Sequence, residues 1–533
     1  MADEWWRGAV IYQIYPRSFQ DSTGNGIGDL PGITSRLDHV ASLGVDAIWL
    51  SPFFTSPMAD MGYDVSDYCD VDPLFGTLAD FDALLARAHD LGLRVIIDQV
   101  LSHTSDQHPW FQASRASLTG DKSDWYVWAG PRVDGTPPNN WPSHFGGPAW
   151  EWEPRRKQYY LHNYLTSQPD LNFHNSNVQD ALLDSVNFWL ERGVDGFRLD
   201  TVNYYVHDQQ LRDNPPMDGG PNAGPYEMQD HIYSKTRPEN IKFLKRLRRL
   251  TDKYPDRMLV GEVGVSDDRS VQVMGDYTRE DDRLHMAYSF TMLGDDHSPD
   301  HFRSRIEGFF EGAPDGWPCW SFSNHDVRRH VTRWSGPETD IDALGKQSIA
   351  LLACLPGTLG IYQGEELGQT ETDLDYDELT DPPGLRFWPE YKGRDGCRTP
   401  MVWDLEKANA GFSEATPWLP VKPPQAARAV SEQGADNDSV LATYRRVLAL
   451  RAGIAALKQG DYRFLDTPKP SLVFERSFAA QSVICMLNLS ESQVTIPTPC
   501  ALGDIKFNQS TVIESGSVRM EAHGCLIAEI LLG

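Results

Sequence analysis

The feature of this sequence that most constrains its fold is a repeated alternation of β-rich runs with amphipathic helical patterns. Two helical patterns end in Leu-Gly and one in Arg-Gly directly before a β-rich run, which is typical of a helix C-terminus. Strands that alternate with helices indicate βαβ units and a parallel sheet. The predicted strands are residues 10–16, 47–53, 94–100, 196–201, 258–263, 287–292, 320–326 and 357–364.

Eight such units predict an α/β fold in which the strands close into a (β/α)8 TIM barrel, with a doubly wound open sheet as the alternative. Irregular insertions follow strand three (104–169), strand four (204–236) and strand eight (366–425). The first is rich in Trp, Pro, Gly and Asn, shows no helical period and is predicted to be a lid-like subdomain. The predicted domains are a barrel (1–103 and 170–457), an inserted B domain (104–169) and a C-terminal antiparallel β-sandwich domain (458–533).

Composition excludes several classes of partner. The formal charge is −28, whereas nucleic acid and anionic membranes both require a cationic face. The sequence has no apolar run long enough to span a membrane, and its first residues do not resemble a secretory signal. The seven cysteines are scattered without a CxxC pair, which suits free thiols in a reducing compartment. We therefore expect a cytoplasmic monomer or homodimer that acts on small molecules, with no nucleic-acid or membrane partner.

Acidic side chains stand at the carboxyl ends of three predicted strands: Asp200 on strand four, Glu262 on strand five and Asp326 on strand seven. In a barrel these ends converge on one mouth. An ion pair or a cap would explain any one of them, but three clustered carboxylates repel one another, and sites that tolerate this are usually functional. Paired carboxylates are the groups that cleave glycosidic bonds.

The stretch GVDGFRLDTVN places Arg198 and Asp200 two residues apart, on one face of a strand. A guanidinium beside a carboxylate keeps that carboxylate ionised at neutral pH, as a nucleophile requires. Glu262 has no such neighbour in the sequence. Its pKa is therefore expected to be higher, as a general acid requires.

Nine motifs, in order, resemble the α-amylase family of glycoside hydrolases (glycoside hydrolase family 13), in its oligo-1,6-glucosidase and α-glucosidase branch. They are VIYQIYPRSFQDSTGNGIGDLPGI, GYDVSDY, DQVLSHTSDQHPWF, QPDLN, GFRLDTVN, GEV, SNHD, YQGEELG and GRDGCRTPM. The resemblance covers nearly the whole chain and implies the same barrel, B domain and C-terminal β domain. It also implies a retaining reaction through a covalent β-glucosyl-enzyme intermediate, with the two key carboxyl groups about 5 Å apart.

Position by position, the resemblance assigns Asp200 as the nucleophile and Glu262 as the general acid/base. Asp326 would bind the 2- and 3-hydroxyls of the distorted sugar. Tyr63 would stack on the face of the non-reducing glucose, and Phe145 would lie near the leaving group. The resemblance further implies that the glucose pocket is lined by Asp64, His103, Arg198, His325 and Arg394.

The resemblance also bears on the choice of substrate. QPDLN resembles exo-acting α-glucosidases, which release one glucose at a time. The residue after the nucleophile is Val in α-1,6-specific members and Ala or Thr in those that prefer α-1,4 linkages, and here it is Thr201. We expect a preference for short α-1,4 glucosides such as maltose, with glucosyl transfer as a side activity. The alternatives are an oligo-1,6-glucosidase (isomaltase) and an enzyme that isomerises sucrose or trehalose or hydrolyses sucrose.

Two readings from other classes are less consistent with the sequence. Non-catalytic transporter subunits of this fold carry a membrane helix and have lost catalytic residues, whereas this chain keeps all three carboxylates. A zinc hydrolase would require ligand spacing such as HExxH, which the sequence lacks.

A Gly-rich loop near the N-terminus carries oxygen donors at alternate positions, namely Asp21, Thr23, Asn25, Ile27 and Asp29. Hard cations such as Ca²⁺ or Mg²⁺ bind oxygen cages of this kind, and a tight turn with Asx hydrogen bonds is the alternative. The resemblance favours a structural cation without a catalytic role. Ser102 stands where Asn commonly precedes the histidine of this family, which argues against a calcium site between barrel and B domain.

Overall fold

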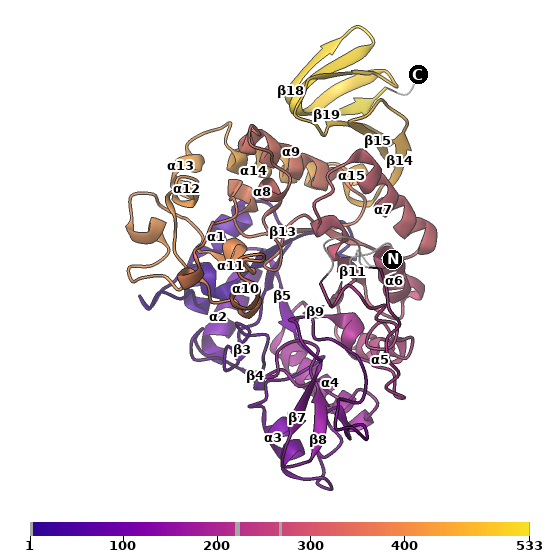
Figure 1. Cartoon of the computed structure of the whole chain (residues 1–533). Coiled ribbons are helices and arrows are strands. Elements are labelled where there is room, and N and C mark those ends of the chain that lie inside the picture. The colour runs from indigo at the N-terminus through magenta and orange to yellow at the C-terminus, as the bar shows by residue number, and fades with distance from the viewer. Residues whose placement is uncertain (1–3, 219–223, 266–268, 532–533) are drawn as a thin grey trace.

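The computed structural model describes residues 4–218, 224–265 and 269–531, so residues 219–223 of the second insertion lie outside it. Its centre is an eight-stranded parallel sheet in the order β11-β10-β9-β5-β2-β1-β13-β12 (Figure 1). A parallel bridge between Ala287 and Pro318 joins the two ends of the sheet. The predicted (β/α)8 barrel is confirmed, with strands β1 (Val10–Ile14), β2 (Ala47–Leu50), β5 (Arg94–Gln99), β9 (Gly196–Leu199), β10 (Met258–Val263), β11 (Met286–Ser289), β12 (Cys319–Ser321) and β13 (Thr358–Tyr362).

All barrel strands except β10 end one to five residues earlier than predicted, and β12 differs most. Residues 290–293 form a 3₁₀ turn after β11, and β12 ends at Ser321, so His325 and Asp326 lie on the following loop. Local hydrogen bonds explain the early end of β12. The Ser321 hydroxyl donates to the Ser323 carbonyl at 2.6 Å, and Asn324 Oδ1 accepts from the Asp326 amide at 2.9 Å. Such bonds compete with a strand ladder.

Helices cover the outer face of the barrel (Figure 1). Their ends follow local sequence signals. Thr77 and Asp80 form a capping box at the start of α2, and Gly193 ends α4 with a φ of 104°. The sequence patterns did not single out α6 and α7. The larger helices are α1 (Leu30–Ser42), α2 (Leu78–Asp90), α4 (Ser176–Arg192), α5 (Asn240–Thr251), α6 (Ser270–Thr278), α7 (Pro299–Gly312), α9 (Ile341–Cys354) and α14 (Val440–Gly453).

The insertion after β5 contains a helix and a small antiparallel sheet in the order β6-β8-β7. The helix was not predicted, because residues 104–169 show no helical period. It is short, begins at Pro109 and is capped by the His108 ring, which accepts from the Trp110 amide at 3.0 Å; eight residues are too few to reveal a period. The elements are α3 (Pro109–Ala116), β6 (Trp128–Ala129), β7 (Trp150–Glu153) and β8 (Gln158–Leu161).

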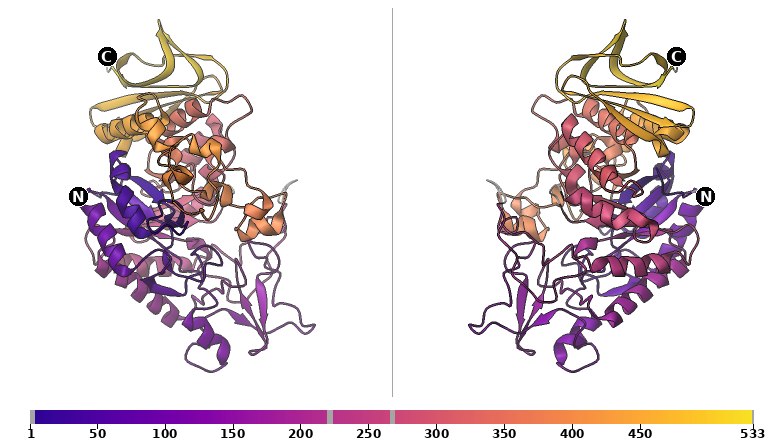
Figure 2. Two further views of the ribbon diagram at one scale, coloured as in Figure 1. Left: turned by 90° about the vertical axis from the view of Figure 1, so that its left-hand side faces the viewer. Right: turned by 90° about the vertical axis from the view of Figure 1, so that its right-hand side faces the viewer.

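The insertion after β13 is a series of short helices, and one of them, α10, lies against the insertion that follows β5 (Figure 2). A Cβ placed on Gly146 would lie only 2.7 Å from Phe387 Cζ, which shows how closely the two segments approach. The short elements of the chain are β3 (Phe54–Thr55), β4 (Asp67–Val71), α8 (His330–Arg333), α10 (Pro382–Phe387), α11 (Asp395–Arg398), α12 (Pro423–Ala426), α13 (Val430–Gly434) and α15 (Ala455–Gln459). The 3₁₀ turns are η1 (Pro16–Ser18), η2 (Val202–Tyr204), η3 (Arg279–Asp281), η4 (Phe290–Leu293), η5 (Glu365–Leu367), η6 (Tyr376–Glu378) and η7 (Ala408–Gly411).

The last strands of the chain form an antiparallel sheet at the end of the molecule opposite the β6-β8-β7 sheet (Figure 1). All six strands belong to one hydrogen-bonded sheet rather than to two separate ones, because the long β19 pairs with β16, β17 and β18. They are β14 (Asp461–Leu465), β15 (Ser471–Phe478), β16 (Gln481–Asn488), β17 (Val494–Pro497), β18 (Leu502–Glu514) and β19 (Ser517–Ile530).

Two expectations from composition can be compared with the structure. All seven cysteines are free thiols. Across the described residues, no helix combines the length and the apolar character needed to cross a membrane.

Candidate active site

Arg198 lies at the centre of a buried carboxylate cluster at the carboxyl end of the barrel. Its Nη1 donates to Asp98 Oδ1 at 2.9 Å and to Asp200 Oδ1 at 2.6 Å, and its Nη2 donates to Glu262 Oε1. Asp98 lies on β5, Asp200 directly follows β9 and Glu262 lies on β10. Closure of the barrel therefore brings acids from three neighbouring strands to one guanidinium.

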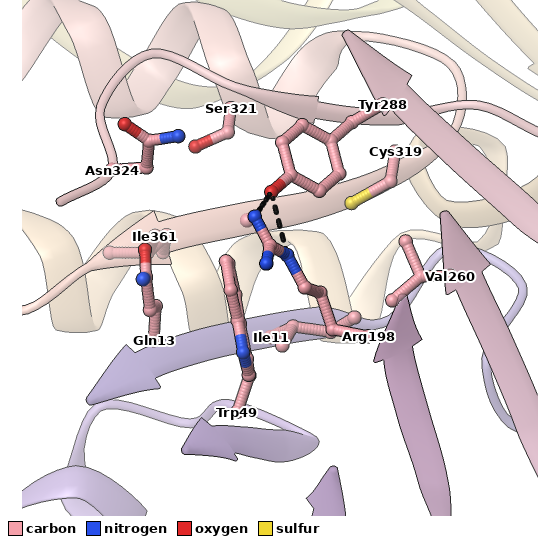
Figure 3. Close-up of a pocket in the computed structure, with 11 residues that line it drawn as sticks. Ile11, Gln13, Trp49, Arg198, Val260, Tyr288, Cys319, Ser321, Asn324 and Ile361 are labelled. Carbon is pink, nitrogen blue, oxygen red and sulfur yellow. Dashed lines mark hydrogen bonds between the residues drawn. The ribbon is translucent and has the colours of Figure 1, made fainter. Parts of the chain in front are cut away.

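Tyr288 of β11 completes the contacts of this guanidinium, as Figure 3 shows. Its hydroxyl accepts from Arg198 Nε at 3.0 Å and from Nη2 at 2.8 Å, and donates to Glu262 Oε1 at 3.0 Å. The Trp49 ring also packs on the guanidinium, with its centroid 4.9 Å from Arg198 Cζ. The cluster therefore has an aromatic surrounding that holds the arginine in one position and excludes water.

Burial dominates the electrostatics of the two proposed catalytic acids. Burial raises the pKa of Asp200 to about 7 and that of Glu262 to about 7, although Arg198 acts in the opposite direction on both. The expectation that Glu262 lacks a cationic neighbour is wrong. Strands β9 and β10 pair in parallel with Arg198 beside Val260, so the guanidinium reaches Glu262 as easily as Asp200. Contact with Arg198 therefore does not show which of Asp200 and Glu262 is the nucleophile and which is the acid.

Asp326 lies in a more cationic environment. Its Oδ1 accepts from Arg398 Nη2 at 2.9 Å and from Arg394 Nη1 at 3.3 Å, and its Oδ2 lies 3.3 Å from His325 Nε2. Burial opposes ionisation, but these three neighbours outweigh it and hold the pKa of Asp326 well below its usual range. Asp326 is therefore a permanent anion, suited to binding sugar hydroxyls by charge-assisted hydrogen bonds.

Tyr63 and His325 form one stacked unit beside the cluster. Their rings are 5.2 Å apart and inclined by 5°. The Tyr63 hydroxyl lies 2.6 Å from His325 Nε2 and 3.1 Å from Asp98 Oδ2, and Gln13 Nε2 lies 2.7 Å from His325 Nδ1. Burial lowers the pKa of His325 well below its usual value, although the Asp326 carboxylate acts in the opposite direction.

The other predicted pocket residues have different surroundings. Arg394 donates to Asp60 Oδ1 at 2.8 Å, and its Cζ lies 5.0 Å from the centre of the Phe145 ring. Asp64 is fully buried and stabilises its own loop, because its carboxylate accepts from the Ala59 amide at 2.8 Å and the Asp60 amide at 3.0 Å. Asp60, which sequence reasoning missed, is thus the acid of this loop that reaches Arg394.

His103 and Thr201 are joined through Ser102. Ser102 Oγ lies 2.9 Å from His103 Nδ1 and 3.0 Å from Thr201 Oγ1, and all three residues are buried. The Thr201 amide donates to Glu262 Oε2 at 3.1 Å. Both predicted residues therefore lie at the edge of the carboxylate cluster.

Several residues of the cluster were not assigned from the sequence. Asp98 carried a visible signal, as an acid at the end of the strand RVIIDQV, and Arg398 follows Arg394 by four residues in GRDGCRTPM. Gln13 and Tyr288 had no signal, because a glutamine or a tyrosine inside an apolar strand is ordinary; only the closure of the barrel shows where these side chains meet.

The loop at residues 21–29 directs its carboxylates toward backbone amides. Asp21 Oδ1 accepts from the Gly24 amide at 2.8 Å, and Asp21 Oδ2 accepts from the Gly26 amide at 2.8 Å. Asp29 Oδ1 caps α1 by accepting from the Gly32 amide at 2.6 Å. These bonds are those of Asx turns and a helix cap, so the donor set as arranged does not fit a cation cage. A structural Ca²⁺ or Mg²⁺ here stays a prediction that requires the loop to rearrange.

Comparisons with known proteins agree on one group. A family model described as "Alpha amylase, catalytic domain" matches residues 13–460. The chain is 57% identical to a probable alpha-glucosidase of Rhizobium meliloti (strain 1021) over 504 residues, which cover 93% of this chain and 91% of that protein. It is 37% identical to an oligo-1,6-glucosidase of Heyndrickxia coagulans over 532 residues, covering 93% and 94%. The crystal structure of the alpha-glucosyl transfer enzyme XgtA superposes with a TM-score of 0.95 at 51% identity and covers 99% of each chain.

Proposed function

The chain belongs to the alpha-amylase family and is an α-glucoside hydrolase, and we propose that it is an exo-acting, retaining α-glucosidase that prefers α-1,4 linkages. The observation that carries the proposal is the meeting of Asp200 and Glu262 on Arg198, beside the permanently ionised Asp326. Two carboxyl groups held on one guanidinium suit a nucleophile and an acid acting on the same glycosidic bond.

The proposed reaction has two steps. Asp200 attacks the anomeric carbon while Glu262 donates a proton to the glycosidic oxygen, so the bond to the leaving group breaks and a β-glucosyl-aspartate forms. Glu262 then removes a proton from water, whose oxygen attacks the same carbon and releases α-glucose and the free Asp200 carboxylate. An alcohol or a second sugar in place of that water gives glucosyl transfer. The similarity to XgtA, an alpha-glucosyl transfer enzyme, supports this side activity.

Contacts around Arg394 support exo action. Arg394 connects Asp326 with Asp60, and its guanidinium lies over Phe145 of the insertion after β5. Beyond it, α10 packs against Gly146. These contacts close the site on the Asp326 side of the cluster. A closed side is expected of a pocket that receives the end of a sugar chain, whereas a cleft that binds the middle of such a chain is open on both sides.

Initial rates on maltose, isomaltose, sucrose, trehalose and maltotriose test the substrate preference. We expect maltose to be cleaved with a higher kcat/KM than isomaltose, with α-glucose as the first product in NMR spectra of the reaction. Faster cleavage of isomaltose would favour the oligo-1,6-glucosidase alternative, which the name of the Heyndrickxia coagulans relative makes the next candidate. A β-anomeric first product would contradict the retaining course.

Asp200→Asn tests the mechanism. It removes the nucleophile while keeping the shape of the side chain, so kcat should fall by at least about 1000-fold. The matched control is Asp82→Asn, which changes an exposed acid that pairs with Arg192 on the outer helices and should leave kcat unchanged. Wild-type activity in Asp200→Asn would refute the proposed role.

A further inference from the structure

A chain of hydrogen bonds joins the residue after the proposed nucleophile to the loop that follows β5. Ser102 Oγ lies 3.0 Å from Thr201 Oγ1 and 2.9 Å from His103 Nδ1, and His103 Nε2 lies 2.9 Å from the Tyr63 carbonyl oxygen. Ser102 is 2% exposed, so bulk water does not compete for its hydroxyl. The proposed two-step reaction leaves Ser102 without a role.

The hydrogen bonds that link Thr201 to the Tyr63 carbonyl all donate in one direction. Burial lowers the pKa of His103 to about 4, so the ring is neutral at neutral pH and carries one N–H. The Tyr63 carbonyl can only accept, which places that hydrogen on Nε2. His103 Nδ1 must then accept from the Ser102 hydroxyl, and the Ser102 oxygen accepts from the Thr201 hydroxyl.

Gln168 is the other polar group at this ring nitrogen. Its Nε2 lies 3.2 Å from His103 Nε2, but also 3.1 Å from Asp60 Oδ2 and 3.4 Å from the Tyr63 carbonyl oxygen. Its two hydrogens therefore have a carboxylate and a carbonyl as acceptors. The direction of the chain does not depend on a bond from Gln168 to the ring.

The backbone of Thr201 is fixed as firmly as its hydroxyl. Its φ is 41°, in the left-handed region that β-branched residues rarely adopt, and its amide donates to Glu262 Oε2 at 3.1 Å. Because the Thr201 hydrogen points to Ser102, the lone pairs of Thr201 Oγ1 are what the side chain offers to a sugar hydroxyl.

We propose that Ser102 is a positioning residue for linkage specificity, which makes Thr201 a hydrogen-bond acceptor toward the sugar that leaves or attacks. The inference rests on the proposed function, because it takes Thr201 as the residue that distinguishes α-1,4 from α-1,6 glucosides. A glucoside whose hydroxyl donates to Thr201 Oγ1 is favoured over one that must accept from it. Without the Ser102 hydroxyl, the Thr201 hydroxyl rotates freely and can either donate to a sugar hydroxyl or accept from it. Discrimination between the two kinds of glucoside therefore weakens.

A double-mutant cycle tests this coupling. The proteins are wild type, Ser102→Ala, Thr201→Val and the double variant, and the readout is the ratio of kcat/KM for maltose to kcat/KM for isomaltose. Loss of one oriented neutral hydrogen bond should move this ratio toward unity by about 3- to 10-fold in Ser102→Ala. In the Thr201→Val background the same substitution should leave the ratio unchanged, since no hydroxyl remains to be oriented.

The ratio separates two consequences of Ser102→Ala. The substitution also removes the partner of His103 Nδ1, and His103 is proposed to contact the glucose that both substrates share. That loss lowers both kcat/KM values by one factor and cancels in the ratio. Ser105→Ala is the matched control, because Ser105 is equally buried and its hydroxyl accepts from the Gln107 amide at 3.1 Å. It should leave the ratio unchanged, and thermal melting checks that each variant folds.

Three outcomes would overturn the proposal: an unchanged ratio in Ser102→Ala, an equal change in both backgrounds, or an equal change in Ser105→Ala. Failure of the proposed function is visible separately. If wild type prefers isomaltose, the α-1,4 assignment is wrong, yet the coupling is still measured as the movement of the ratio toward unity.

Discussion

Arg198 is the residue whose surroundings explain most of the chemistry of the site. One guanidinium faces Asp98, Asp200 and Glu262, so the cluster carries more negative than positive charge when all three acids are ionised. In a buried site that imbalance is relieved by binding protons. Burial accordingly raises the pKa of Asp98 to about 6, and those of the other two acids to about 7.

The cluster predicts a bell-shaped pH dependence of kcat/KM with its maximum near neutrality. Below the maximum the proposed nucleophile Asp200 becomes protonated and cannot attack, and above it the proposed acid Glu262 loses the proton that it would donate. Because the two acids interact, the two apparent pKa values belong to the pair. The measurement is kcat/KM on maltose across the pH range. A rate that rises steadily into alkaline solution would contradict the assignment of Glu262 as the acid.

Tyr288→Phe should move the alkaline limb of that profile to higher pH. The Tyr288 hydroxyl donates to Glu262 Oε1, which favours the ionised carboxylate, so its removal raises the pKa of Glu262. We also expect kcat to fall by about 10-fold, because Glu262 and Arg198 lose a shared contact. Tyr12→Phe removes a buried hydroxyl on the opposite side of the barrel wall, bonded to Glu366, and should leave the alkaline limb in place.

At the scale of the element, helix ends determine where the strands that carry the carboxylate cluster begin. Helix α4 ends at Gly193 in the left-handed conformation, and β9 starts three residues later and carries Arg198 to the cluster. A Cβ at Gly193 would meet only Leu85 Cδ2, at 3.5 Å, so space is available and backbone conformation is the obstacle.

Gly193→Ala should therefore lower the free energy of unfolding by about 1 kcal/mol through its positive φ. The substitution lies outside the cluster, so kcat/KM should be retained at temperatures where the protein is folded. Urea denaturation and maltose kinetics measure the two effects. Gly453→Ala is the control, because Gly453 ends α14 outside the left-handed region with open space around it, and its effect should be smaller.

The elements that sequence reasoning found are those with a strong local signal. All eight barrel strands are β-rich runs in the sequence, and the motif residues Asp200, Glu262 and Asp326 lie at or just beyond the ends of three of them. Helix α3 was missed because eight residues show no period, and the end of β12 was misplaced because side-chain hydrogen bonds of Ser321 and Asn324 replace the ladder. Those bonds depend on tertiary positions that periodicity does not contain.

At the scale of the whole molecule, a buried arginine joins distant parts of the chain. Arg451 of α14 donates to the carbonyl oxygens of Ala353 at 2.6 Å, Gly357 at 2.7 Å, Leu457 at 2.8 Å and Gly8 at 3.1 Å. The arginine thereby connects the chain before β1, the turn between α9 and β13, and α15, which leads into the C-terminal sheet.

Arg451→Met should lower the free energy of unfolding by about 2 kcal/mol. Each carbonyl oxygen that loses its donor lowers the free energy of unfolding by about 1 kcal/mol or more. Removal of the buried charge offsets part of this loss, because burying a charge is itself unfavourable. Arg463→Met is the matched control, because Arg463 pairs with Glu475 at the surface and such pairs contribute about 0.5 kcal/mol. Chemical denaturation of both variants measures the difference; equal effects would show that Arg451 does not hold these segments together.

The pairing that closes the barrel joins a strand synthesised early to a strand synthesised late. Strand β1 pairs with β13 from Val10 with Leu359 to Gln13 with Tyr362. Ribosomes add about 5–20 residues per second, so β1 emerges on the order of tens of seconds before its partner exists. Throughout that interval the growing chain carries a strand edge with no hydrogen-bonding partner of its own, and must keep it from pairing with other nascent chains.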